Sequence, residues 1–130
     1  MNDEGGASGS GTMAAIGSGV LWGLLIMLTG AVIQGVWAYK SPLPPGAEET
    51  AMLIWQGLGA VVAGFFAARR AAGAGWLHGG LAGCALAMAA TAIMGVLTDL
   101  PEMLAFARAV GSGAGLGALA GIAGINLGGR

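Results

Sequence analysis

Long stretches without a charged residue dominate this sequence and restrict the folds open to it. Only 8% of the 130 residues are Asp, Glu, Lys or Arg, against about 25% in a soluble domain. A helix needs roughly 20 apolar residues to cross a bilayer, and none of these stretches alternates as a barrel strand does. The charge-free stretches are residues 5–39, 50–68, 71–98 and 109–129. The sequence therefore predicts an all-α membrane protein with four transmembrane helices.

The four stretches divide the chain into a single membrane domain, residues 13–130, and a short segment before it. Residues 1–12 are acidic and Gly/Ser-rich and lack the basic segment of a secretory signal, so we expect a disordered N-terminal tail. Asp99 and Glu102 have the spacing of a capping box and predict the start of the last span. The predicted spans are residues 13–39, 50–68, 77–98 and 100–127.

The few basic residues indicate an orientation. Arg69 and Arg70 follow the second span, so the positive-inside rule places this loop and both termini in the cytoplasm. Arg130 adds to that side, whereas Lys40 and Arg108 belong to the other. Because the difference is one residue, insertion in both orientations stays open.

Glycine and alanine make up much of the spans, and their spacing predicts how the helices pack. Glycine weakens a helix in water by about 1 kcal/mol, but in lipid it allows two helix backbones to approach closely. Residues four apart share a helix face. We expect these faces to form one compact Gly/Ala-rich bundle, with a homo-oligomer interface as the alternative. The predicted packing residues are Gly19, Gly23, Ala60, Gly64, Gly75, Gly79, Gly83, Gly113, Gly117 and Gly121.

A weak internal repeat is also visible. The string Gly-Leu-Gly-Ala at residues 57–60 returns at residues 115–118, and the pair Gly19 and Gly23 aligns with Gly79 and Gly83. Such a repeat predicts two helical hairpins in the same orientation, related by an axis along the membrane normal.

Four polar residues lie at similar depth in the spans, about 9 to 12 Å from the predicted outer boundary. They are Gln34, Gln56, Thr91 and Arg108. Facing inward, they would form a polar layer in contact with a small solute, because an ionisable group inside a membrane is a functional candidate. Alternatively, the last helix protrudes and Arg108 extends its guanidinium to the interface.

A second polar set lies near the cytoplasmic side: Ser18, His78 and Asn126. His78 is the single histidine and Cys84 the single cysteine, so the sequence predicts no metal site, no cofactor and no catalytic triad. All six acidic residues lie in the N-terminal tail or at the two predicted outer turns. A net charge of −1 gives no basic footprint for nucleic acid. We therefore expect a protein that is not an enzyme.

Several short strings resemble a family of small four-span bacterial membrane proteins of uncharacterised function, best represented in Gram-positive and spore-forming lineages. They are Ala67-Ala68-Arg69, Gly75-Trp76-Leu77-His78-Gly79 with Gly83, Gly121-Ile122-Ala123-Gly124-Ile125-Asn126-Leu127, and Gly19-Val20-Leu21 with Gly23. The resemblance covers roughly residues 15–128. It implies a four-helix architecture and a plasma-membrane location, and it brings no activity with it.

Two functions fit these observations. The first is an accessory or assembly subunit that uses its small-residue faces to associate with itself or with another membrane protein, in contact with membrane lipid. The second is a small channel or transporter for an anion or a small polar solute, with Gln34, Gln56 and Arg108 lining its outer vestibule.

Overall fold

Four long helices form the protein, as the sequence predicts. The computed structural model describes residues 5–71, 73–99 and 101–128. The helices are α1 (Gly5–Lys40), α2 (Ala47–Arg70), α3 (Gly75–Leu97) and α4 (Met103–Gly128). All four are long and apolar enough to cross a membrane, which makes this a multi-pass membrane protein.

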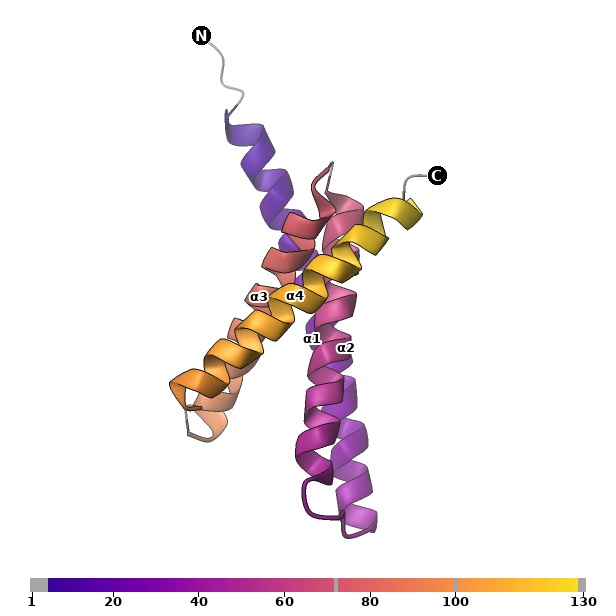
Figure 1. Ribbon diagram of the computed structural model, residues 1–130, viewed down its shortest axis with the longest axis vertical. Helices are drawn as coiled ribbons and strands as arrows, with labels where there is room; N and C mark the ends of the chain where they lie inside the picture. The colour runs from indigo at the N-terminus through magenta and orange to yellow at the C-terminus, as the bar shows by residue number, and fades with distance from the viewer. Residues whose placement is uncertain (1–4, 72, 100, 129–130) are drawn as a thin grey trace.

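The first helix begins earlier than predicted. Residues 5–12, expected to belong to a disordered tail, continue α1 back to Gly5, and residues 1–4 lie outside the described part of the chain. This segment contains no proline, and extending an existing helix costs far less than nucleating a new one. With 36 residues, α1 is about 54 Å long and projects beyond the other helices (Figure 1).

The last helix begins later than predicted. Asp99 was expected to cap it, but α4 starts at Met103, and the carbonyl of Glu102 accepts the first helical hydrogen bond, from the amide of Phe106 at 3.0 Å. Pro101 accounts for the difference, because a proline disfavours helical geometry in the residue before it. At the start of α2, Glu48 and Glu49 lie in the first turn, where their carboxylates complement the positive end of the helix dipole.

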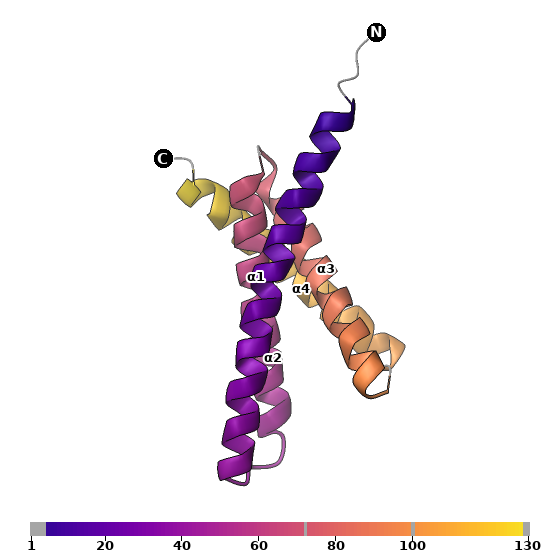
Figure 2. The ribbon, with the colours of Figure 1, turned by 180° about the vertical axis from the view of Figure 1, so that it is seen from behind.

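The helices form two antiparallel hairpins, α1/α2 and α3/α4, which cross in the shape of an X (Figures 1 and 2). The last two residues of α2 are Arg69 and Arg70, and we call this end of the molecule the arginine end. At the other, the acidic end, Glu48, Glu49, Asp99 and Glu102 lie close to the turns that join each pair. The hairpins diverge toward the acidic end. Over the described residues, α2 and α3 each pack against all three other helices, whereas the backbones of α1 and α4 do not approach closely.

Small residues form the contacts at the crossing. All ten predicted packing residues are buried. Gly117 lies between two other helices: a Cβ atom added to Gly64 would be 2.6 Å from the Gly117 Cα, and one added to Gly79 would meet the Gly117 carbonyl. The largest fully buried side chain is Leu86, whose Cδ2 lies against Gly23 and Gly59. The small-residue faces are therefore used within the chain.

The two hairpins use similar small-residue contacts in different registers. In α1/α2, Gly19 meets Ala63 and Gly23 meets Gly59. In α3/α4, the closest contacts of Gly79 and Gly83 are with Gly117 and Gly113. The offsets of 60 and 58 residues would instead pair Gly79 with Gly121 and Gly83 with Gly117, one helical turn away. The internal repeat therefore stays a prediction.

We expect Gly79→Ala and Gly117→Ala each to lower the free energy of unfolding by about 1–3 kcal/mol, because the added methyl group meets the backbone of the neighbouring helix. Gly115→Ala is the matched control, since a Cβ there meets nothing within 4 Å. Unfolding by SDS in micelles, followed by circular dichroism, measures the difference. Equal stability of all three variants would contradict the proposed packing.

Candidate functional site

The four residues of the predicted polar layer are divided between the two hairpins. Gln34 and Gln56 belong to α1/α2, and Thr91 and Arg108 belong to α3/α4. The Gln34 Nε2 donates a hydrogen bond to the Glu48 carbonyl at 2.9 Å, and Thr91 Oγ1 donates to the Ala87 carbonyl at 2.8 Å. The first bond joins α1 to the start of α2 and the second lies within α3, so neither joins the two hairpins.

Arg108 is exposed near the start of α4. It follows Met103 by five residues, which places its Cα about 7.5 Å along the helix. Its guanidinium has no carboxylate or aromatic partner within the described ranges. A side chain of this length reaches the interface from that depth.

A pocket of about 730 Å³ lies between α1, α2 and the proline-rich turn that joins them. Its lining is mostly apolar and includes Trp37, Trp55 and Pro45. Two polar side chains in it, Gln34 and Thr50, donate to backbone carbonyls of the α2 start. These bonds hold the turn in place.

The residues of the predicted cytoplasmic cluster form local hydrogen bonds. Ser18 Oγ donates to the Ala15 carbonyl at 3.1 Å, and His78 Nδ1 contacts the Ala74 carbonyl at 3.1 Å. Asn126 is exposed. No hydrogen bond links these three residues in the described structure. In the same ranges no group of three or more His, Cys, Asp and Glu side chains could hold a metal ion.

The sequence analysis did not predict an exposed face of α4 that carries small and polar residues. We call it the α4 face; it consists of Arg108, Gly111, Ser112, Gly115 and Leu119. All five residues are exposed, and a Cβ added to Gly111 or Gly115 meets nothing within 4 Å. Their spacing of three and four is visible in the sequence. It did not distinguish this face from the buried one, because glycines occur on both.

A row of aromatic rings leads to the arginine end. The rings of Trp22 and Phe66 stack with centroids 5.2 Å apart, and Phe66 contacts Phe65 edge to face at 5.7 Å. The Arg69 guanidinium lies over Phe65, 5.6 Å from the ring centroid. The contacts therefore connect α1 to the last turn of α2.

The fold agrees with a family match along most of the chain. The model of the family described as Protein of unknown function (DUF3792) matches residues 12–124. The chain belongs to this family. No curated protein and no solved structure matches the chain.

Membership of the DUF3792 family confirms the resemblance to small four-span membrane proteins of uncharacterised function. Of the residues that carry the resemblance, Gly75, Gly79 and Gly121 lie at the α3/α4 contact: a Cβ added to Gly75 would be 2.5 Å from the Gly121 carbonyl oxygen. Trp76 and Leu77 between them are exposed. These strings thus combine helix packing with a surface at the arginine end.

Gln34→Leu removes the one side-chain hydrogen bond described between α1 and the start of α2. We expect the free energy of unfolding to fall by about 0.6–1 kcal/mol, the usual size of an interhelical bond in a membrane. Gln56→Leu on the same hairpin is the control, since Gln56 forms no side-chain hydrogen bond with the described residues. Unfolding in micelles tests this, and an equal loss in both variants would contradict it.

Proposed function

We propose that this DUF3792 protein is a non-catalytic accessory or assembly subunit of the bacterial plasma membrane. It binds a transmembrane helix of another membrane protein through the α4 face. Four membrane-spanning helices and the family of unknown function agree with this role. The observation that carries the proposal is the α4 face itself, where a Cβ added to Gly111 or Gly115 meets nothing within 4 Å in the described part of the chain.

Small residues on a membrane helix serve close contact with another helix. Gly111 and Gly115 are four apart, and Ser112 lies beside them with its hydroxyl bonded to the Ala109 carbonyl at 3.1 Å. The glycines at the crossing contact a neighbour, whereas these two face outward. A partner helix packed here would gain the same close backbone approach that joins the hairpins.

Arg108 indicates the chemistry of the partner. It lies at the acidic-end side of the α4 face without a partner in the described ranges, and its guanidinium reaches the interface, where it can pair with a carboxylate at the end of a partner helix. In a symmetric dimer of two copies inserted in the same orientation, the two-fold axis runs along the membrane normal, so this face would hold both copies of Arg108 at the same depth in one interface. We therefore favour a different protein whose helix offers a carboxylate to Arg108.

The structure changes which small residues such an interface uses. The faces of Gly79 and Gly117, for which a homo-oligomer interface was the alternative to packing in one bundle, pack within the chain. Substitution there would disturb the fold and the partner contact together. Substitution in the α4 face would disturb the partner contact alone, because this face is exposed.

The proposed orientation places the arginine end in the cytoplasm, with both chain termini on that side. Arg69 and Arg70 support it through the positive-inside rule. No observation on the described residues specifically supports the alternative function, a channel or transporter lined by Gln34, Gln56 and Arg108. Gln34 binds a backbone carbonyl of its own hairpin, and Arg108 belongs to the other hairpin.

A photo-crosslinking amino acid in place of Leu119, which is 67% exposed, tests the proposal in native membranes. We expect an adduct with a membrane protein that carries an acidic residue in or beside a span. Gly111→Leu/Gly115→Leu should abolish the adduct by blocking close approach, and Arg108→Gln should weaken it. Gly17→Leu is the control, because Gly17 is also exposed and without neighbours.

Three results would overturn this proposal. They are the absence of an adduct, an adduct that survives Gly111→Leu/Gly115→Leu, and an adduct between two copies of this chain. Unchanged helix content of each variant by circular dichroism shows that the fold itself is preserved.

A further inference from the structure

The arginine end presents two cations at the level where lipid phosphates lie. Arg69 and Arg70 are the last two residues of α2, and both are exposed. The uncharged part of α2 before them, Ala51 to Ala68, is about 27 Å long, close to the thickness of the hydrocarbon core. The guanidinium groups therefore lie at the boundary between acyl chains and headgroups.

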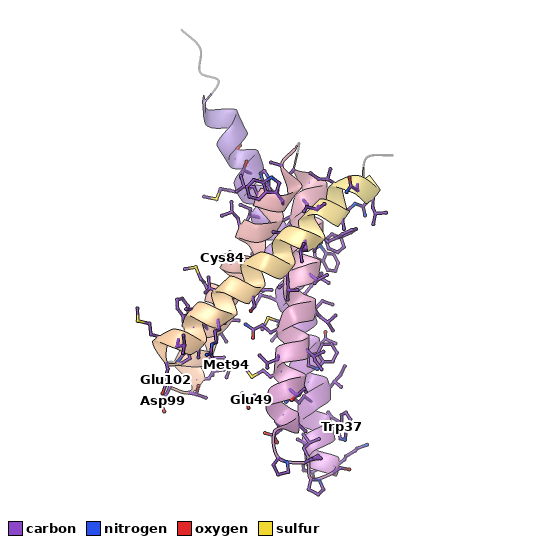
Figure 3. All side chains as sticks on the ribbon, in the orientation of Figure 1. Trp37, Glu49, Cys84, Met94, Asp99 and Glu102 are labelled. Atoms are coloured by element: carbon purple, nitrogen blue, oxygen red, sulfur yellow. The ribbon has the colours of Figure 1, made fainter. Side chains whose placement is uncertain are left out.

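The protein itself offers these cations no described counter-charge. The carboxylates in the described ranges, Glu48, Glu49, Asp99 and Glu102, lie at the opposite ends of the helices; Figure 3 labels three of them. Along α2 the separation of Glu49 from Arg69 is about 30 Å. At that distance exposed charges are screened by salt, so none of the carboxylates in the described ranges competes with an external anion for the two arginines.

One of the two guanidinium groups is held in position. Arg69 lies over the Phe65 ring, and Phe65 is packed in turn: it contacts Phe66, and its carbonyl lies 2.7 Å from the position of a Cβ added to Gly124 of α4. The cation–π contact restricts the arginine side chain while leaving its N–H groups free to donate. Less side-chain freedom is then lost when an anion binds.

A tryptophan lies at the same end. Trp76, in the first turn of α3, is 58% exposed, and tryptophan concentrates at the headgroup level of membranes. Arginine forms bidentate bonds with phosphate oxygens. We propose that Arg69 and Arg70 bind the phosphate of an anionic phospholipid headgroup, with Trp76 beside it in the same layer.

The membrane position favours a lipid over a soluble anion. The headgroup layer holds phosphate at the level of the two guanidinium groups, and an anionic leaflet attracts each basic residue near its surface. A zwitterionic headgroup carries the same phosphate without the net charge. Preference for the anionic lipid is therefore the property that defines the site.

Native mass spectrometry of the full chain in detergent, with added dioleoyl phosphatidylglycerol or dioleoyl phosphatidylcholine, tests the proposal. We expect the protein to bind phosphatidylglycerol more tightly. Each arginine contributes roughly fivefold, so Arg69→Gln/Arg70→Gln should weaken binding of phosphatidylglycerol about 25-fold and binding of phosphatidylcholine, which carries the same phosphate without the net charge, by a smaller factor. Lys40→Gln/Arg108→Gln, which removes the same charge from the opposite end, should leave both affinities within about twofold.

Two further measurements keep the result interpretable. Arg70→Gln alone preserves the contact with Phe65 and should show the fivefold loss even if the double variant unfolds. A large excess of inorganic phosphate should not displace the lipid. The proposal fails if both double variants lose the lipid equally, if neither loses it, if the two lipids bind equally, or if inorganic phosphate displaces phosphatidylglycerol.

Discussion

The close approach of glycine backbones is the interaction on which this structure depends. Lipid tails are as apolar as the side chains of the helices, so burial of apolar surface does not drive the helices together in a membrane. Packing and weak polar contacts between backbones must do so. Gly117 shows this most clearly, since it contacts Gly64 of α2 and Gly79 of α3. A side chain at that one position would separate three helices.

Because the contacts concentrate at the crossing, the rest of each hairpin is free of the other. Toward the acidic end the hairpins diverge, and each is held by its own bonds, such as that from Gln34 to the Glu48 carbonyl. The same concentration leaves one face of α4 without neighbours. The two proposed interactions, with a partner helix and with a lipid headgroup, both use surface that is not buried where the hairpins cross.

The sequence allowed much of the architecture to be predicted, and particular residues show where prediction stopped. Hydropathy predicted four spans because length and charge alone decide what can cross a bilayer. The helix α4 starts three residues later than predicted, because Pro101 opposes the helix start that the capping pattern of Asp99 and Glu102 indicates. The depth of Arg108 in the membrane could be predicted from the sequence, because depth follows from counting residues along a helix. The side to which Arg108 points could not, because it depends on how that helix is rotated against its neighbours.

The sequence by itself determined that the chain crosses the membrane four times, that its helices approach through glycines, and that its charges lie at the helix ends. Only the tertiary structure decided which glycines meet and which face outward. Gly117 and Gly115 are two residues apart in similar surroundings, yet one is buried between helices and the other has no neighbour. The physical reason is rotation: residues two apart on a helix point to different sides, and packing against the neighbouring helices selects which side is buried.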